Sequence, residues 1–378
     1  MQSTLNGKRV IFFSNTGWYL YNFRLSLIEA CRNNGAEVVL LCPKDNYTDR
    51  LQNLGFYVKT IEFERKSINF CQDFRVILTL RKLQKSKLPT IVHSFTLRCI
   101  FLSTMAGLFG SPYSNVHSFT GMGFLFSQKS VNKKQFAKFL LGLVSVPLRF
   151  KSNRVIVQNP DDFKLLAKTF IPPTSITLIP GSGVDIKHFS KNNYANLTAQ
   201  QNVTVLIATR ILADKGIHEF IEAAKIIGQC KPLIKFLIAG KIDEGNPSSI
   251  KQSEVDAWKA LPNIDFLGHQ ENMLAVYRRS DIVVLPSYRE GLPKTLIEAC
   301  SCGLPIIATD VPGCNHVVQD GENGFLVPIR DAKNLAEKIV FLSKSFSLRE
   351  RMGKNGRRKA EQLYDHKVIN EKTIRLYL

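Results

Sequence analysis

Short apolar runs alternate with amphipathic segments through the first half of the chain. The apolar runs have the length of strands and are rich in β-branched and aromatic residues, which is typical of strands buried on both faces of a parallel sheet. They occupy residues 10–14, 37–43, 56–63, 90–95, 114–119, 154–159 and 176–180. Helix-length segments separate them, such as 23–33 and 70–86, the latter with one broad apolar face. The first half therefore predicts a series of strand–helix units.

The same pattern restarts after a polar segment. Residues 191–202 are rich in Asn and Gln and lack periodicity, so we expect a linker there. Strand-length runs then recur at 203–209, 234–240, 264–268, 281–287 and 304–310. Two such series predict an α/β fold of two Rossmann-like, doubly wound domains facing across a cleft, with ligands beyond the carboxyl ends of the strands.

The length of the chain agrees with two domains. Its 378 residues exceed the roughly 250–300 at which single hydrophobic cores stop growing. We expect a first domain over residues 1–195 and a second over 196–361. The final helical segment, about 362–378, is expected to pack back on the first domain.

The formal net charge of +20 favours a polyanionic partner, which includes nucleic acid, anionic lipid and phosphorylated substrates. Charge alone does not choose among them. A nucleic-acid binder predicts aromatic side chains interleaved with basic ones for base stacking. The basic residues here are instead spread along the chain, so we expect no nucleic-acid partner.

One segment, residues 133–154, combines basic and apolar side chains. Lys133, Lys134 and Lys138 lie near an apolar stretch at 139–148. Such a helix suits the headgroup layer of an anionic membrane, but a helix packed inward with basic ends fits equally well. The stretch is about half the ~20 residues that span a bilayer, and the first residues do not resemble a secretory signal. We expect a peripheral protein on an anionic membrane surface.

The eight cysteines do not indicate a metal site. They are scattered, without a C-x-x-C pair, and several lie in apolar runs where a free thiol acts as a small hydrophobic side chain. This usage fits a reducing compartment, so we expect a cytoplasmic protein.

The strongest chemical signal is the segment 286–313, PSYREGLPKTLIEACSCGLPIIATDVPG. A strand ends at its beginning, Glu290 and Gly291 form a turn, and Pro293 falls where proline is favoured in the first turn of a helix. The amides of Gly291, Leu292 and the first helical turn would bind an anion through unpaired N–H groups and the helix dipole.

Two carboxylates of this segment suit a sugar nucleotide. Glu298 lies about one turn inside the helix, where it can accept hydrogen bonds from a diol such as ribose. Glu290 lies at the tip of the loop, where it can accept from sugar hydroxyls.

A second signal follows the strand at 203–209. Arg210 and Lys215 could clamp a diphosphate as the leaving group gains charge, which is stabilisation of a transition state by fixed charge. Taken alone, two ordinary surface cations before a helix would be the better interpretation.

Together these motifs resemble a known family. R-x4-K-G, E-x7-E, A-T-D-x-P-G and GENGFLVP follow one another in the order found in the retaining glycosyltransferases of family 4, which have the GT-B fold. The resemblance implies that Arg210 and Lys215 bind the donor diphosphate and that Glu290 contacts the transferred sugar. It further implies a ribose contact for Glu298 and a phosphate contact for Thr295.

The resemblance also carries expectations about the rest of the donor site. The loop at 267–269, which contains Gly268, usually borders the base. The chain has no D-x-D motif, so the two cations and the helix start would supply the positive charge, and we expect neither a metal nor any other cofactor. The family retains the anomeric configuration without an agreed enzymic nucleophile, and the phosphate of the donor is thought to help deprotonate the acceptor.

The amino-terminal half is expected to hold the acceptor. Gly17 lies at a turn where the backbone can approach a ligand closely, and Arg24 either meets an acceptor phosphate or is simply exposed. His93 matches a histidine-containing strand end of the family. His117 is the nearest histidine to a glycine-rich acceptor loop, in which Thr120 replaces the usual histidine, and we include His117 as a candidate catalytic residue.

Within the family, this half is most similar to bacterial enzymes that extend polyprenyl-diphosphate sugars, above all N-acetylgalactosaminyltransferases. The cues are YNFR at 21–24, the stretch 43–48 and RKSIN at 65–69. We expect transfer of an N-acetylhexosamine or hexose from a UDP-sugar to an undecaprenyl-diphosphate-linked saccharide, on the cytoplasmic face of the inner membrane. The alternative is a UDP-sugar epimerase of the same fold.

Overall fold

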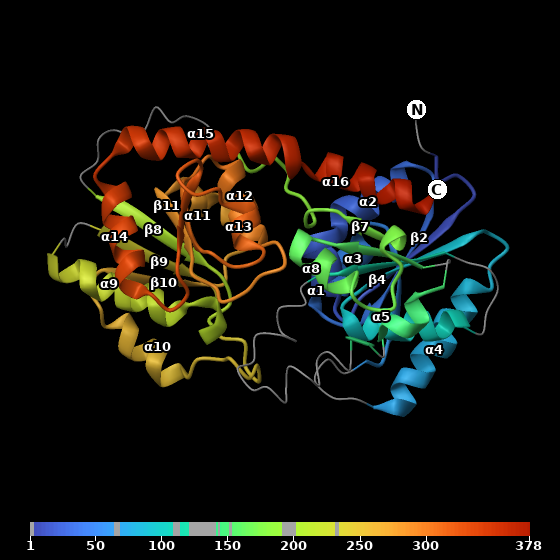
Figure 1. The fold of residues 1–378 in the computed structure, drawn as a ribbon. Helices are drawn as coiled ribbons and strands as arrows, with labels where there is room; N and C mark the ends of the chain where they lie inside the picture. The colour runs from blue at the N-terminus through green and yellow to red at the C-terminus, as the bar shows by residue number, and fades with distance from the viewer. Residues whose placement is uncertain are drawn as a thin grey trace. The chain divides into compact units, whose positions relative to one another are not determined.

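The computed structural model describes residues 4–63, 69–108, 114–120, 141–142, 144–150, 153–190, 202–230 and 234–378 (Figure 1). Internal contacts divide the chain into two units. One comprises Met1–Ser182 with His366–Leu378, and the other comprises Gly183–Asp365. The division after Ser182 precedes the expected boundary after residue 195, because the segment that follows Ser182 packs on the second unit.

The first unit contains a seven-stranded sheet in which every pair of neighbouring strands is parallel. Its strands are β1 (Arg9–Phe13), β2 (Glu37–Pro43), β3 (Tyr57–Ile61), β4 (Thr90–Phe95), β5 (Ser114–Phe119), β6 (Asn153–Val157) and β7 (Ile176–Leu178). They are ordered β3-β2-β1-β4-β5-β6-β7, so the direction of winding reverses between β1 and β4. All seven strands expected in this half are confirmed.

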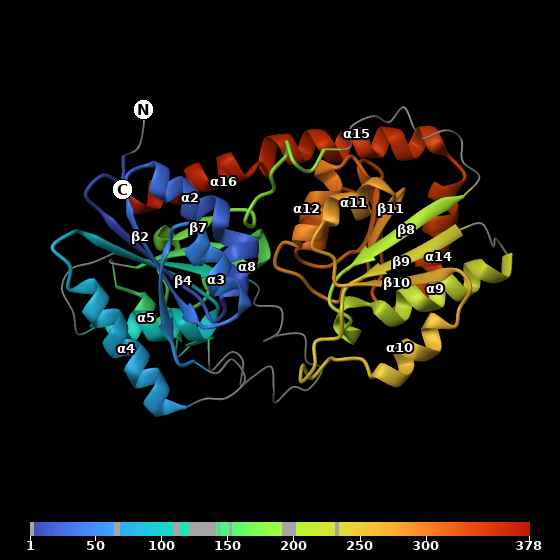
Figure 2. The ribbon, with the colours of Figure 1, turned by 180° about the vertical axis from the view of Figure 1, so that it is seen from behind.

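Helices cover both faces of this sheet (Figures 1 and 2). They are α1 (Gly17–Tyr19), a π-helical turn η1 (Leu20–Arg24), α2 (Leu25–Asn33), α3 (Asn46–Asn53), α4 (Phe70–Gln84), α5 (Leu97–Leu108), α8 (Pro160–Leu166), the 3-10 turns η2 (Pro173–Ser175) and η5 (Arg375–Tyr377), and α16 (His366–Ile374). Phe12 packs in a core with side chains of α2 and α16, whereas its neighbour Phe13 packs with α4 and α5. This alternation explains why the strands read as continuous apolar runs.

The second unit has a six-stranded parallel sheet ordered β10-β9-β8-β11-β12-β13. Its strands are β8 (Val203–Ala208), β9 (Ile234–Ala239), β10 (Ile264–Gly268), β11 (Ile282–Leu285), β12 (Ile306–Thr309) and β13 (Gly324–Val327). The winding reverses between β8 and β11. The strand β13 was not among the expected strands, because its segment was recognised only as part of a motif. The prediction of two Rossmann-like sheets is confirmed.

The helices of the second unit alternate with its strands, and α12 begins and ends beside the expected Pro293 and Gly303. They are the 3-10 turn η4 (Ala213–Lys215), α9 (Ile217–Cys230), α10 (Gln252–Lys259), α11 (Met273–Arg278), α12 (Lys294–Ser301), α13 (Cys314–Val317), α14 (Ala332–Ser343) and α15 (Phe346–Leu363). Gly303, with φ of 68°, follows α12 in the left-handed conformation that commonly ends a helix.

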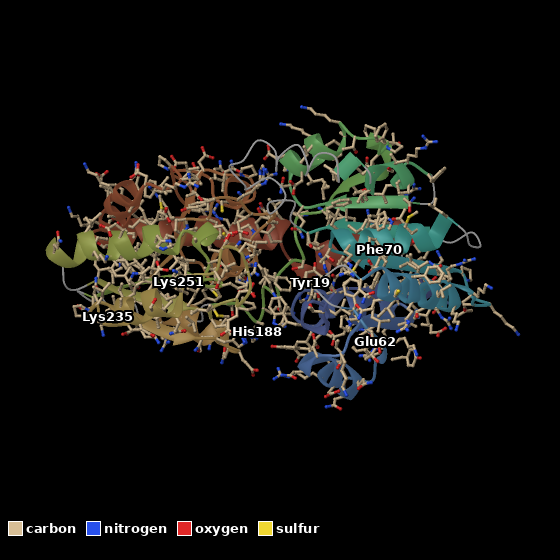
Figure 3. The ribbon with its side chains drawn as sticks, turned by 90° about the horizontal axis from the view of Figure 1, so that it is seen from below. Tyr19, Glu62, Phe70, His188, Lys235 and Lys251 are labelled. Carbon is tan, nitrogen blue, oxygen red and sulfur yellow. The ribbon has the colours of Figure 1, made fainter. Side chains whose placement is uncertain are left out.

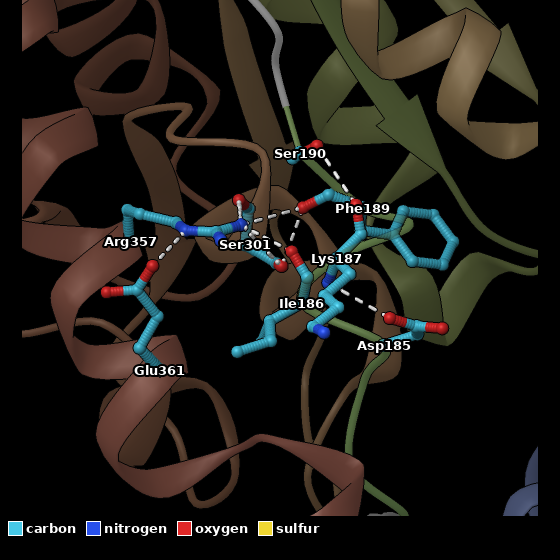
Figure 4. Close-up of polar contacts among 8 residues, drawn as sticks. All are labelled: Asp185, Ile186, Lys187, Phe189, Ser190, Ser301, Arg357 and Glu361. Atoms are coloured by element: carbon cyan, nitrogen blue, oxygen red, sulfur yellow. Dashed lines mark hydrogen bonds and ion pairs between the residues drawn. The ribbon is translucent and has the colours of Figure 1, made fainter.

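Arg357 of α15 fastens the start of this unit to α12 (Figure 4). Its Nη1 donates to the carbonyl oxygens of Ile186, Phe189 and Ser301 at 2.8, 3.0 and 2.6 Å, and its Nε lies 2.6 Å from Oε1 of Glu361. Phe189 in turn makes an edge contact with Tyr277, with ring centroids 6.1 Å apart. The segment after Ser182 is thus an integral part of the second unit.

Some expectations fall on residues outside the described set. These are the linker at 191–201, most of the basic segment including Lys133, Lys134 and Lys138, and part of the RKSIN motif. Within the described residues, none of the helices combines the length and the apolar character needed to cross a bilayer. The described residues also contain no group of three His, Cys, Asp or Glu side chains arranged to hold a metal ion.

Candidate active site

The predicted donor residues follow the two strands at which the second sheet reverses its winding. Arg210 lies just after β8, Lys215 ends the turn η4 that follows, and Glu290 follows β11. These strands are neighbours, with Ile282 paired to Val205. Ligands of doubly wound sheets bind beyond the carboxyl ends of strands at such a point. The topology therefore brings together two motifs that lie about 80 residues apart in the sequence.

Lys215 and Glu290 form an ion pair, with Nζ 2.6 Å from Oε1. Only 15% of the lysine side chain and 13% of the glutamate side chain are exposed, so solvent screens this pair far less than a surface pair. The pair fixes a cation and an acceptor of hydrogen bonds side by side. That combination can bind a phosphate and a sugar hydroxyl on adjacent parts of one ligand.

Two glycines allow the loops that carry this pair to approach one another. Gly216 has φ of +73°, and a Cβ there would lie 2.1 Å from the carbonyl oxygen of Pro286. Gly313 has φ of +88°, and a Cβ there would lie 2.6 Å from the carbonyl oxygen of Glu290. The amide of Glu290 also donates to Pro312 O at 3.1 Å. Gly216 of R-x4-K-G and Gly313 of A-T-D-x-P-G thus allow the close backbone contacts that position the Lys215 ammonium and the Glu290 carboxylate.

Arg210 is held by a different partner. Its Nη1 lies 2.6 Å from Oδ2 of Asp243, which also accepts from Asn246 Nδ2 at 3.2 Å. Nearly half of the arginine side chain (47%) is exposed. Arg210 and Lys215 therefore share one end of β8, but each is paired with its own carboxylate.

The helix after the Glu290 loop begins at Lys294, as expected. Pro293 is the N-cap of α12 and not its first helical residue, and no side chain caps the helix start. The amides of the first turn of an α-helix lack acceptors within the helix, so this end can bind an anion. Leu292 is largely buried beside it, and Gly291 lies between Leu292 and Glu290.

Glu298 is buried within α12. Its Oε2 accepts from the hydroxyl of Tyr277 at 2.9 Å, and its Oε1 lies 3.6 Å from Nζ of Lys294. Burial raises the pKa of the Glu298 carboxyl, and the positive charge of Lys294 opposes the shift. Thr295 uses its carbonyl oxygen to accept from the same Tyr277 hydroxyl, at 3.2 Å.

Gly268 ends β10 with φ of +67°, and a Cβ there would meet no atom within 4 Å. Its carbonyl accepts from the amide of Gly240 at 2.8 Å. The loop that follows β10 thus lies at the same end of the sheet as the residues after β8 and β11.

The first unit places its candidates differently. Gly17 lies against Asp45, and a Cβ on Gly17 would lie 2.5 Å from Asp45 Oδ1. Oδ2 of Asp45 also accepts from the amide of Trp18 at 2.9 Å. The close approach at Gly17 is therefore made by Asp45 from the segment after β2.

His117 is fully buried in β5, which argues against the catalytic role considered for it. Its Nε2 lies 3.1 Å from Oδ1 of Asn153 on β6, and burial lowers the pKa of its ring to about 4. His93 is also buried, with its ring nitrogens on the hydroxyls of Tyr377 and Ser118. Both histidines act as polar parts of the core, so we leave His117 out of the proposed site.

Sequence patterns did not identify Tyr277 and Asp243, the partners of Glu298 and Arg210. Tyr277 lies in an apolar helical run in which nothing marks it as polar and functional, and Asp243 lies in an ordinary turn. Each is brought to its partner by tertiary packing alone.

Two doubly wound parallel sheets, the second with a cation–carboxylate pair at its winding reversal, fit the GT-B fold of glycosyltransferases. Comparison with known proteins agrees. Residues 190–359 match the model of the family "Glycosyl transferases group 1", and residues 9–159 match that of the family "Glycosyl transferase 4-like". The chain belongs to these glycosyltransferases, and the epimerase alternative is not favoured.

Individual relatives cover almost the whole chain. One is the N,N'-diacetylbacillosaminyl-diphospho-undecaprenol alpha-1,3-N-acetylgalactosaminyltransferase of Campylobacter jejuni, which is 27% identical over 379 residues and 98% of each chain. Another is the UDP-Gal:alpha-D-GlcNAc-diphosphoundecaprenol alpha-1,3-galactosyltransferase of Escherichia coli, 26% identical over 84% of this chain and 83% of its own. Among solved structures, HepE of Anabaena, in complex with UDP and glucose, has a TM-score of 0.79 at 17% identity and covers 97% of this chain and 98% of its own.

Proposed function

We propose that this glycosyltransferase transfers a sugar, with retention of configuration and without a metal, from a UDP-sugar to an undecaprenyl-diphosphate-linked saccharide. The Lys215–Glu290 pair is the main support for the proposal. It holds a side chain suited to binding the diphosphate beside a side chain suited to binding the sugar, at one end of the sheet. The names of the Campylobacter and Escherichia relatives support the class of acceptor.

Each donor residue has a role that follows from its chemistry. The two phosphates are bound by Lys215, Arg210 and the start of α12, where Gly291 and Leu292 supply amide N–H groups and Pro293 and Thr295 lie nearby. Glu290 accepts from hydroxyls of the transferred sugar. Glu298 accepts from the ribose, and the loop at Gly268 borders the base.

The reaction breaks the bond between the anomeric carbon and the phosphate oxygen of the donor. A bond to the acceptor hydroxyl oxygen forms on the same face of the sugar, and the hydroxyl proton passes to a phosphate oxygen of the departing UDP. Negative charge develops on that phosphate, so the fixed cations of Lys215 and Arg210 stabilise the transition state more than the ground state.

The acceptor places the enzyme at a membrane. A polyprenyl chain stays in the bilayer, so the protein would act as a peripheral protein on the inner membrane, on its cytoplasmic face. The basic segment around Lys133, Lys134 and Lys138 is the proposed contact with anionic lipid.

The test is a screen of UDP-sugars against short-chain polyprenyl-diphosphate sugars, with products identified by mass and anomer by NMR. We expect one donor to give an α-linked product without added metal, and loss of about 100-fold or more in turnover for Glu290→Gln. Glu254→Gln, an exposed carboxylate of the same unit, is the matched control and should retain full activity. Hydrolysis of the donor with no transfer to any acceptor, an inverted product, or full activity of Glu290→Gln would refute the proposal.

A further inference from the structure

The first unit holds a buried arginine that has no acidic partner among the residues described by the structure. Arg24 at the end of η1 is only 5% exposed. Its Nε and Nη2 donate to the hydroxyl of Tyr19 at 3.0 and 2.8 Å, and its guanidinium lies over the ring of Phe95, 4.6 Å from the centroid. Among the residues that the structure describes, Arg24 forms no ion pair.

The lack of a counter-ion is costly for a folded protein. Burying a charge is strongly unfavourable unless it is paired, and a neutral phenol and a ring face offset only part of that cost. The adjacent His93 supplies no negative charge either. Its pKa is held well below the usual value by burial and by the charge of Arg24. An anion bound beside Arg24 would supply the missing negative charge and offset the cost of burying the guanidinium.

The position of Arg24 in the fold is that of a ligand site. Tyr19 and Arg24 follow β1, and Phe95 ends β4. The winding of the first sheet reverses between these two strands, so this end is where a doubly wound sheet binds ligands. The second unit places Lys215 and Glu290 at the corresponding reversal between β8 and β11.

Two local features at this end agree with a binding role. Thr96, directly after β4, has φ of 72°, which is strained for a β-branched residue, and such strain gathers at functional sites. Ser14, directly after β1, is fully buried, and its hydroxyl has no hydrogen-bond partner among the described residues.

The surroundings of the arginine are aromatic. Trp18 is 38% exposed and Phe23 is partly exposed, and their rings lie edge to face with centroids 5.3 Å apart. The ring of Tyr19, which is labelled in Figure 3, stacks on that of Phe23 with centroids 5.3 Å apart. A cation bordered by partly exposed aromatic rings suits a ligand with an anionic head and an apolar chain.

We propose that Arg24 is the binding residue for the diphosphate of the polyprenyl acceptor, with Trp18 and Phe23 contacting the adjoining isoprene units. The proposal rests on the proposed function, because it assigns the anionic group of that acceptor to a site in the first unit. Arg24 binds and orients the acceptor and takes no part in bond making.

Binding can be measured without the donor. The chain has two tryptophans, so Trp258→Phe leaves Trp18 as the only indole reporter. In that background we would titrate farnesyl diphosphate, farnesol and inorganic pyrophosphate and follow Trp18 fluorescence. We expect farnesyl diphosphate to bind tightest, since it alone offers both the charge and the apolar chain.

Arg24→Gln is then expected to weaken farnesyl diphosphate about tenfold or more and to change farnesol less than about twofold, because only the charged ligand loses a charge-assisted hydrogen bond. Arg32→Gln is the matched control, since Arg32 lies 4.2 Å over the ring of Phe56 in the same unit. It should change neither affinity. Should Arg24→Gln fail to fold, Arg24→Lys keeps the charge but loses the planar fork, and it should weaken farnesyl diphosphate several-fold, again without affecting farnesol.

Several results would overturn the proposal. Equal losses for farnesyl diphosphate and farnesol would make Arg24 a structural residue, and unchanged affinities would remove it from the site. Pyrophosphate binding as tightly as farnesyl diphosphate would assign the site to a soluble phosphate. Binding of UDP, measured separately, should be unchanged in Arg24→Gln. If no sugar transfer were found while Arg24 still bound farnesyl diphosphate, the proposed function would fail and the anion site would stand.

Discussion

Single residues of this protein act through the partner that tertiary structure gives them. Lys215 was recognisable from the sequence as a cation before a helix, but its pairing with Glu290 requires β8 and β11 to be neighbours. His117 shows the opposite case. Its position near a glycine-rich loop made it a catalytic candidate, yet the sheet buries it against Asn153. Motif order therefore pointed to Lys215 and Glu290, which the fold brings together, and their roles in donor binding stay predictions. Local sequence did not predict which histidine would be buried.

The burial of His117 predicts a pH dependence of stability. Its folded pKa of about 4 is below the usual histidine value of 6.5, so between these values the unfolded chain binds more protons. The free energy of unfolding should fall as the pH drops from about 6.5 toward 4, by up to about 3 kcal/mol from this residue. Denaturant unfolding of His117→Asn at pH 7 and 4.5 should show a smaller pH dependence than the wild type.

The control for this experiment is His269→Asn, because His269 is exposed and forms no ion pair among the described residues. This variant should keep the wild-type pH dependence. If the unfolding free energy of His117→Asn depended on pH as strongly as that of the wild type, groups other than His117 would account for the acid sensitivity.

At the scale of elements, the sequence predicted most strands because buried parallel strands read as unbroken apolar runs. It missed β13, where Gly324 and Phe325 begin a short edge strand in a segment dominated by turn residues. The start of α12 at Lys294 was predicted, with Pro293 directly before it as the N-cap. The close approach of loops was the least predictable feature, because it depends on backbone atoms that are distant in sequence.

The turn at Gly216 offers a test of that close approach. Gly216→Ala places a Cβ 2.1 Å from Pro286 O, in addition to the left-handed strain of about 1–2 kcal/mol. We expect the variant to lose roughly 2–4 kcal/mol of unfolding free energy and much of its affinity for UDP, because Lys215 moves with the turn. Chemical denaturation and calorimetry measure the two effects.

Gly321→Ala is the matched control, since Gly321 also has a positive φ (+76°) but has no atom within 4 Å of a Cβ. Gly321→Ala should lose only the unfolding free energy that comes from the left-handed strain, and it should bind UDP with wild-type affinity. Equal losses in the two variants would mean that the contact with Pro286 contributes nothing to the position of Lys215.

At the scale of the whole molecule, the two units repeat one principle. Each is a parallel sheet whose winding reverses once, between β1 and β4 in the first and between β8 and β11 in the second, and each carries cations after those strands. This arrangement was predictable from two successive series of strand–helix units. The identity of the sugar and the role of the basic segment stay predictions, because side chains from many loops determine the first and the second lies largely outside the described residues.

The central claim is that the second unit binds a nucleoside diphosphate through Lys215. Calorimetric titration of UDP and of uridine into the wild type and Lys215→Ala tests it, with the exposed Lys225→Ala as control. We predict that Lys215→Ala weakens UDP about tenfold or more, because a charge-assisted contact is lost and Glu290 is left unpaired, while uridine binding is unchanged. Equal UDP affinity in the wild type and Lys215→Ala would contradict the claim.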